Sequence, residues 1–244
     1  RHNLESSKAV VRRGIKPWYE DSPALVEEVR RLIRSHFPTL LVQIEGQVVY
    51  VRGVLPILDL TTGAEIDRYL IEIELPADYP KSVPLVREKG GRIPKVIERH
   101  ILPSDGTCCL FVRDEQWRHY RERTTILEFI NGPVYQYFLG QSHFELTGKW
   151  LFGERGHGIL GILEYYSEEL GTKDLKFILA FLNYLTKKKV KGHWACFCGN
   201  GKRLRDCHFK KLAQMRQRTP RLVALESLIQ IQTTLTERER MRNA

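Results

Sequence analysis

Three cysteines and a histidine crowd into residues 196–208 of this chain. They form two pairs, one Cys-x-Cys and one Cys-His, separated by eight residues, and Gly199 and Gly201 permit a tight turn between the pairs. Thiolates and imidazole at such spacing close a tetrahedron around zinc, and a closed set of four ligands is structural rather than catalytic. The predicted ligands of a structural Zn²⁺ are Cys196, Cys198, Cys207 and His208.

Cys109 lies in a second segment that could do chemistry. The stretch from Gly90 to about Arg123 has little hydrophobic periodicity, and an irregular segment of that length inside a compact domain is usually functional. A cysteine in an accessible loop can form a bond to an acyl group and release it again. We therefore predict that Cys109 is a nucleophile; the alternative is a small buried hydrophobe.

Helical and strand patterns on either side of Cys109 indicate what holds it. Ser22-Pro23 predicts the start of a helix over about 23–36, with Leu25, Val26, Val29, Leu32 and Ile33 on one face. Short β-branched runs then predict an antiparallel meander. Its strands are expected near Leu40–Ile44, Gln47–Val54, Tyr69–Leu75 and Leu85–Arg87. The proline-rich stretch 76–84 is expected to form an ordered turn before the last strand.

The second half of the chain reads as helical. A helix over about 126–138 must bend or break at Gly132-Pro133, and helices are predicted over 158–169 and 174–188. After the cysteine cluster, Thr219-Pro220 opens a last helix. Its predicted apolar face consists of Leu222, Leu225, Ile229 and Leu235.

Bulk composition limits the function classes. The chain has 244 residues, 42% of them apolar, with no apolar run near the roughly 20 residues needed to span a bilayer, and we expect a cytoplasmic protein without membrane contact. The odd number of cysteines, five, does not suggest a disulfide framework. Residues 187–244 hold 15 Lys and Arg against 4 Asp and Glu. This basic end is expected to meet an acidic partner or to be a solvated surface.

The loop around Cys109 resembles the active-site signature of ubiquitin-conjugating enzymes. In His100-Ile101-Leu102-Pro103-Ser104-Asp105-Gly106-Thr107-Cys108-Cys109-Leu110 a His opens the loop, a Gly stands three positions before the Cys and a Leu follows it. Trp117 lies eight positions after Cys109, and Tyr79-Pro80 with Pro84 precedes the loop. The resemblance covers roughly residues 20–145. It implies that Cys109 carries the C-terminus of a ubiquitin-like protein as a thioester. Cys108 stands where the family has an aliphatic residue, so we expect it to pack inward or, alternatively, to form a redox-sensitive pair with Cys109.

One departure from that family concerns the support of the reaction. The family's His-Pro-Asn provides an Asn for the loop or the oxyanion, whereas Ile101 and Leu102 follow His100 here. Loss of an oxyanion donor commonly costs about 100- to 1000-fold in rate. The residues that could substitute are Ser104, Asp105 and Thr107. Asp114 and Glu115 are candidates to desolvate or deprotonate an incoming lysine, and His100 is a candidate general base or, alternatively, a structural hydrogen-bonding residue.

The cysteine cluster is similar to the SEC-C zinc motif, with its Cys-x-Cys-Gly-x-Gly-Lys core and terminal Cys-His pair. That resemblance covers about fifteen residues and implies a docking role for the basic end. A phosphate-rich ligand such as nucleic acid would bind there mainly through charge. Phe197, Trp194 and Phe209 could stack on bases or, alternatively, cover the small module as its hydrophobic core.

These features together predict an α+β fold. An N-terminal helix, a four-stranded antiparallel meander and an active-site loop of the ubiquitin-conjugating type precede helices and a small zinc-binding tail. The expected domains are a conjugating-like domain over 15–145, a helical connector over 146–192, a SEC-C type motif over 193–212 and a basic C-terminal helix over 213–244.

Three functions remain open. The resemblances imply a transferase of a bacterial antiviral conjugation system, whose partners would be a ubiquitin-like protein or another modified protein C-terminus, an activating enzyme and a nucleotidyltransferase immune effector. The first alternative is a catalytically inactive conjugating-enzyme fold that acts as a binding module. The second is a nucleic-acid-binding protein whose residues 187–244 retain full binding alone.

Overall fold

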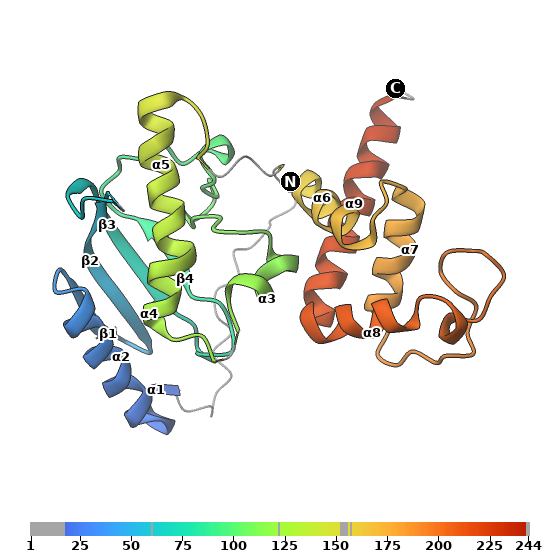
Figure 1. Ribbon diagram of the computed structural model, residues 1–244, viewed down its shortest axis with the longest axis horizontal. Coiled ribbons are helices and arrows are strands. Elements are labelled where there is room, and N and C mark those ends of the chain that lie inside the picture. The colour runs from blue at the N-terminus through green and yellow to red at the C-terminus, as the bar shows by residue number, and fades with distance from the viewer. Residues whose placement is uncertain (1–17, 60, 122, 152–155, 157, 243–244) are drawn as a thin grey trace. The chain divides into compact units, whose positions relative to one another are not determined.

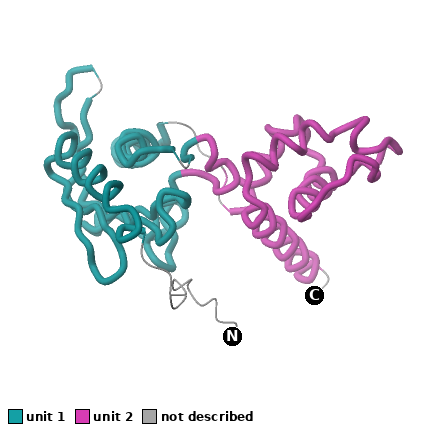
Figure 2. The backbone as a smooth tube through the Cα atoms, turned by 90° about the horizontal axis from the view of Figure 1, so that it is seen from below, with its two compact units in different colours: residues 1–110, 119–153 teal, residues 111–118, 154–244 magenta. Residues whose placement is uncertain are grey.

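The structure is a computed structural model that describes residues 18–59, 61–121, 123–151, 156 and 158–242. The first residues of the predicted conjugating-like domain, 15–17, lie outside this set. Contacts divide the chain into two compact units (Figure 2). Unit 1 comprises Arg1–Leu110 and His119–Gly153, and unit 2 comprises Phe111–Arg118 and Glu154–Ala244. The chain therefore passes from unit 1 into unit 2 directly after Leu110 and returns at His119.

A four-stranded antiparallel sheet in the order β1-β2-β3-β4 forms the centre of unit 1, which confirms the predicted meander. Its strands are β1 (Leu40–Glu45), β2 (Val48–Leu58), β3 (Glu65–Leu75) and β4 (Leu85–Glu88). In β2 the residues Val49, Val51, Leu55 and Ile57 are buried and alternate with more exposed positions, as a strand with one covered face requires. Buried β3 residues on the same side complete that face of the core.

Helices flank this sheet in unit 1. The short α1 (Trp18–Asp21) precedes α2 (Pro23–His36), whose Val26, Val29 and Ile33 are buried as predicted. A turn with the hydrogen bond from the Tyr79 amide to the Pro76 carbonyl leads into β4, in agreement with the expected proline-rich turn.

The predicted break at Gly132-Pro133 is confirmed. Helix α4 (Ile126–Phe129) begins with a capping box made by Thr125 and Glu128, and a π-helical segment (Ile130–Val134) joins it to α5 (Tyr135–Thr147). Gly132 has non-helical dihedral angles within that segment, just before the proline that removes a helical donor. Figure 1 shows α4 and α5 lying along one face of the sheet.

Unit 2 is built on one shared hydrophobic core. Its longer helices are α6 (Ile159–Leu170), α7 (Leu175–Leu185), α8 (Phe209–Arg218) and α9 (Arg221–Arg242), with a short 3-10 turn, η4 (Leu204–Asp206), in the cysteine segment. The same cluster contains Tyr166 and Phe181 from the helices, Cys196 and Phe197 from the cysteine motif, and Ile231 from α9. The predicted connector, the cysteine motif and the last helix therefore share one core and do not form three separate parts.

Helix α9 buries a face that matches the predicted one only in part. Leu235 packs against the core of unit 2 as expected, and Leu225 is partly buried. Leu222 is 61% exposed and Ile229 is 53% exposed, whereas Val223, Ala224 and Leu228 are buried in the core of unit 2. Both faces of this helix carry apolar residues, so the pattern allowed either orientation, and packing selected the face with the small Ala224.

No helix among the described residues combines the length and apolar character needed to cross a membrane. The longest, α9, is interrupted by charged residues in its second half.

Candidate functional sites

The segment that carries Cys109 is a short hairpin of irregular backbone. Ile101 and Cys108 form an isolated antiparallel bridge, and the Leu102 amide donates to the Thr107 carbonyl at 2.9 Å. The carboxylate of Asp105 accepts from the Thr107 amide at 3.0 Å, which fixes the turn at the hairpin's tip. Every residue from Leu102 to Asp105 is exposed. The hairpin therefore presents its tip to solvent while its base is tied to the fold.

The backbone of Cys109 is anchored to His100. The Cys109 amide donates to the His100 carbonyl at 2.7 Å, and His100 adopts a left-handed conformation with φ of 51°. Such a conformation is uncommon for a residue with a side chain and needs support from its surroundings. The imidazole ring provides part of it, because it packs edge-on against Trp150 with ring centroids 4.6 Å apart. These contacts give His100 a structural role.

The two adjacent cysteines have different environments. Cys108 is 5% exposed, and burial raises the pKa of its thiol to about 12 although Tyr137 opposes that shift. Cys109 is partly exposed, and burial, followed by the negative charge of Asp105, raises the pKa of its thiol from 9.0 to about 11. Neither is in a disulfide. Cys109 is thus partly exposed but protonated at neutral pH, and Cys108 packs inward as expected.

Helix α5 holds the carbonyls at the base of the hairpin. The Tyr137 hydroxyl donates to the Arg99 carbonyl at 3.1 Å and to the His100 carbonyl at 3.3 Å. The Gln141 side chain, which is 0% exposed, donates to the Arg99 carbonyl at 2.7 Å and accepts from the Arg99 guanidinium at 2.9 Å. Since Cys109 hydrogen-bonds to that same His100 carbonyl, α5 fixes the backbone of the thiol residue.

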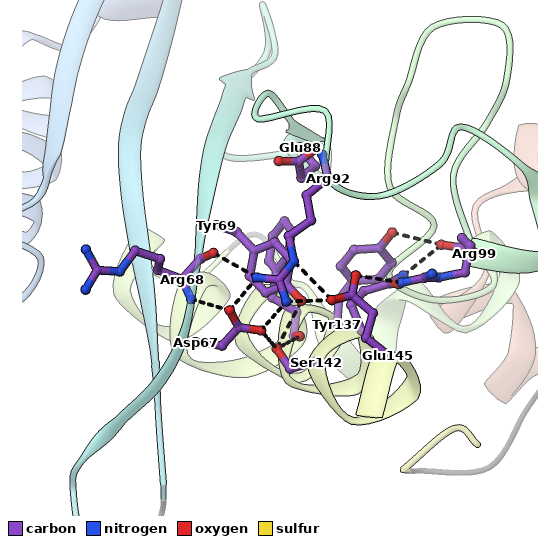
Figure 3. A network of polar contacts seen from close by, with 11 residues as sticks. Asp67, Arg68, Tyr69, Glu88, Arg92, Arg99, Tyr137, Ser142 and Glu145 are labelled. Carbon is purple, nitrogen blue, oxygen red and sulfur yellow. Dashed lines mark hydrogen bonds and ion pairs between the residues drawn. The ribbon is translucent and has the colours of Figure 1, made fainter. Parts of the chain in front are cut away.

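This support continues into a network of charged residues that joins α5 to β3 (Figure 3). Arg92 donates to the carboxylates of Asp67 and Glu145, and Glu145 also accepts from Arg99 at 3.1 Å. Ser142 donates to Asp67 at 2.6 Å. The Arg92 and Ser142 bonds outweigh burial and lower the pKa of Asp67 to about 2. Arg99 is thereby held from its side chain as well as from its carbonyl.

Asp114 does not have the environment of a surface acid. It lies in the 3-10 turn η2 (Arg113–Glu115) of unit 2 and is 1% exposed. Its carboxylate accepts from the Tyr166 hydroxyl and from the Ser227 hydroxyl, both at 2.6 Å. Burial raises the pKa of Asp114 despite these bonds. The predicted action of Asp114 on an incoming lysine is inconsistent with this burial, and its two bonds indicate a structural role.

Trp117 also belongs to unit 2, although the sequence signature placed it with the thiol loop. Its indole donates to the Tyr165 hydroxyl at 2.9 Å, and the Arg218 guanidinium stacks on its ring at 4.2 Å. It therefore ties the short helix α3 (Gln116–His119) to the helices of unit 2. Tyr166 and Ser227 had no motif that predicted this role, because their connection to Asp114 spans 52 and 113 residues.

The four predicted metal ligands come together. Their ligand atoms all lie within 4.8 Å of one another. The Cys198 and Cys207 sulfurs are 3.7 Å apart, close to the edge of about 3.8 Å that a tetrahedron with Zn–S bonds of about 2.3 Å requires. His208 presents Nδ1 at 3.2 Å from the Cys196 sulfur and 3.1 Å from the Cys207 sulfur. Three thiols and an imidazole in this arrangement are able to hold a metal ion.

A short hairpin and an aromatic cluster position these ligands. The Cys196 amide donates to the Lys202 carbonyl at 2.9 Å, and Gly199 and Gly201 take positive φ angles at the turn. The Asn200 side chain donates to the Cys207 sulfur at 3.2 Å, a supporting contact for a ligand. Phe197 packs against Phe177, Phe181, Tyr184 and the His208 ring, so it belongs to the hydrophobic core rather than to a base-stacking surface.

The molecule thus contains a partly exposed cysteine on a supported hairpin in unit 1 and a cluster of three cysteines and a histidine in unit 2. Comparisons of this chain with protein-family models, with curated proteins and with solved structures find no match.

Proposed function

We propose that this protein carries an acyl group, the C-terminus of a ubiquitin-like protein, as a thioester on Cys109 and transfers it to an amine. The observation that carries the proposal is the setting of Cys109. Cys109 is a partly exposed residue that follows a solvent-facing hairpin tip, while its amide is fixed to a carbonyl that Tyr137 of α5 also holds. A nucleophile that must receive and release a large group needs both access and a rigid position.

The proposed chemistry has two substitution steps. In the first, the Cys109 sulfur forms a bond to the carbonyl carbon of a donor thioester, the donor's carbon–sulfur bond breaks, and the proton of Cys109 passes to the departing sulfur. In the second, an amine attacks the same carbon, an amide forms, and the Cys109 sulfur leaves and takes up the proton lost by the amine. Because the pKa of the Cys109 thiol is about 11, both steps depend on proton transfer as the bond changes.

Asp105 is the acid best placed to assist the second step. It is exposed at the hairpin tip, and its charge affects the pKa of Cys109. A carboxylate there attracts a protonated lysine toward the thioester, whereas Asp114 is buried in unit 2. Tyr137 and Gln141 supply the loop support that the ubiquitin-conjugating family obtains from its Asn.

For unit 2 we propose a structural zinc ion held by Cys196, Cys198, Cys207 and His208. Three sulfurs and one nitrogen suit zinc, and a set of four protein ligands leaves no position for a substrate. The ion would cross-link the turn that begins at Cys196 to the start of α8, which follows His208 directly.

A binding module without activity is the second candidate. The raised pKa of Cys109 and the Ile101-Leu102 sequence in place of the family's Pro-Asn favour it. In either case the combined resemblance to a conjugating domain and a SEC-C motif suggests a bacterial antiviral conjugation system. An activating enzyme and a nucleotidyltransferase effector would then be its partners, and the genes beside its own would identify the proteins to test.

The test mixes the purified chain with ATP, the activating enzyme and the ubiquitin-like protein encoded nearby, followed by non-reducing electrophoresis. We expect an adduct that dithiothreitol removes, that Cys109→Ala abolishes and that the neighbouring Cys108→Ser retains. An adduct that survives in Cys109→Ala would refute the assignment. Absence of any adduct, with Cys109 still open to alkylation, would favour the binding module.

A further inference from the structure

The basic residues of unit 2 fall into two groups. Some have structural partners: Lys211 pairs with Glu169 at 2.8 Å, and Arg218 stacks on Trp117. Arg216 donates to a series of carbonyls at the end of α7 and beyond it. These carbonyls belong to Tyr184, Leu185, Lys187 and Lys188. A cation at the C-terminal end of a helix is favourable there, so these residues stabilise the fold.

The second group is exposed and lies on two segments that run side by side. The Leu204 amide donates to the Trp194 carbonyl at 2.7 Å, and the Arg205 amide donates to the Gly192 carbonyl at 2.9 Å. These bonds place residues 192–194 beside residues 204–205, and the lysine segment 187–191 leads directly into this pair. We call residues 187–193 and 202–205 the basic hairpin. Its exposed cations are Lys187, Lys188, Lys189, Lys191, Lys202, Arg203 and Arg205.

The basic hairpin is held in place and is almost free of acids. Arg216 fixes the carbonyls of Lys187 and Lys188, so the lysine segment is tied to α8 and is not a loose tail. Between residues 187 and 225 the sequence contains a single acidic residue, Asp206. Its Oδ2 lies 3.6 Å from Nε of Arg205. The remaining cations thus have little local compensation, and their potential favours a polyanion.

The small number of exposed apolar residues near the basic hairpin distinguishes among polyanions. Trp194 is partly exposed, and Phe209, three residues after Asp206, is 40% exposed. The large hydrophobic residues that are exposed in the described part of the chain include none between 187 and 206. Protein interfaces depend on buried aromatic or aliphatic anchors, and membrane binding by a surface segment needs apolar insertion. A phosphate backbone needs neither, because counterion release supplies most of its affinity.

We propose that the basic hairpin binds the phosphate backbone of nucleic acid without sequence preference. The proposal does not depend on thioester chemistry at Cys109. It also differs from binding by residues 187–244 alone, because that segment shares its core with α6 and α7 and is not an independent unit. The experiment therefore uses the full chain.

The test measures fluorescence anisotropy of a fluorescein-labelled 20-nucleotide oligothymidine between 50 and 200 mM NaCl. The variant Lys188→Glu/Lys189→Glu/Lys191→Glu removes three phosphate contacts, which we expect to weaken binding at 50 mM by about 100-fold or more and to reduce the salt slope by about 2. The control Arg238→Glu/Arg240→Glu/Arg242→Glu makes the same change in net charge on exposed residues of α9. It should reduce affinity by less than about fivefold.

Three results would overturn the proposal. The first is no binding by the wild type at 50 mM salt, and the second is an equal loss in the two triple variants. The third is tighter binding to polyglutamate than to the oligonucleotide, which would indicate an acidic protein as the partner. Cys109→Ala should bind the oligonucleotide like the wild type, because the basic hairpin does not include Cys109. Failure of thioester formation and failure of oligonucleotide binding can therefore be told apart. Matching far-ultraviolet circular dichroism confirms that each variant is folded.

Discussion

The pKa of the Cys109 thiol predicts a slow reaction with alkylating agents. A rise in pKa from 9.0 to about 11 lowers the thiolate fraction at pH 7.4 by about 100-fold. The more basic thiolate is intrinsically more nucleophilic. With a Brønsted coefficient of about 0.4–0.5, the rise in pKa increases the reactivity of the thiolate itself by a factor of about 6 to 10. Cys109 should therefore react at least about tenfold more slowly than a cysteine in a short peptide, since partial burial hinders it further.

The assay follows iodoacetamide labelling of the full chain from pH 7 to pH 10.5. Peptide mass spectrometry reads Cys109 separately from Cys108 and from the metal ligands. The rate should rise about tenfold per pH unit through this range, because the ionised fraction does so below the pKa. Asp105→Asn should raise the rate at pH 8, since Asp105 is the secondary cause of the raised pKa, and Ser104→Ala in the same turn should not. A plateau below pH 9 would show that the pKa of the Cys109 thiol is not raised.

Three further predictions concern the supports of the two units. Gln141→Leu leaves the Arg99 guanidinium without a buried partner and should cost about 1–3 kcal/mol of unfolding free energy in urea. Tyr137→Phe should cost only about 0.5–1.5 kcal/mol, since both carbonyls keep another donor, and equal costs would contradict this accounting. The pKa of Asp114 is raised in the folded state, so the unfolded state ionises first and stability should fall as pH rises from about 4 through the raised pKa. Asp114→Asn should flatten that part of the pH profile in thermal melts, and an unchanged profile would contradict the assignment. Zinc chelation should unfold unit 2, with a loss of helical circular dichroism and the release of one metal ion per chain, and Cys207→Ala should cause the same loss of helical signal. A thermal melt that chelation leaves unchanged would exclude a structural ion.

Local patterns predicted the elements well because their signals are local. The Ser22-Pro23 start, the alternation in β2 and the Gly132-Pro133 break each depend on dihedral preference or on which face is covered. The approach of Cys196, Cys198, Cys207 and His208 was predictable for the same reason, because their spacing and residue types are visible in thirteen consecutive residues.

Long-range partners were not predictable. The Asp114 carboxylate finds Tyr166 and Ser227 only through the packing of α6 and α9, and no motif connects these residues. The sequence offered Asp114 as an acid for an incoming lysine, whereas its carboxylate is buried and accepts from these two hydroxyls. Two residues of the predicted α9 face, Leu222 and Ile229, were wrong because they matched helical spacing as well as Val223 and Leu228 did, whereas Leu235 packs on the core.

Transfer from a small thioester tests the assigned role of Cys109 most directly. The full chain is incubated with a Leu-Arg-Gly-Gly peptide thioester of mercaptoethanesulfonate, quenched in acid, and digested for tandem mass spectrometry. We expect a peptide acyl group on Cys109 that dithiothreitol removes, with none on Cys108. An unmodified Cys109 under conditions in which iodoacetamide still labels it, or acylation at Cys108 instead, would exclude Cys109 as the acyl carrier.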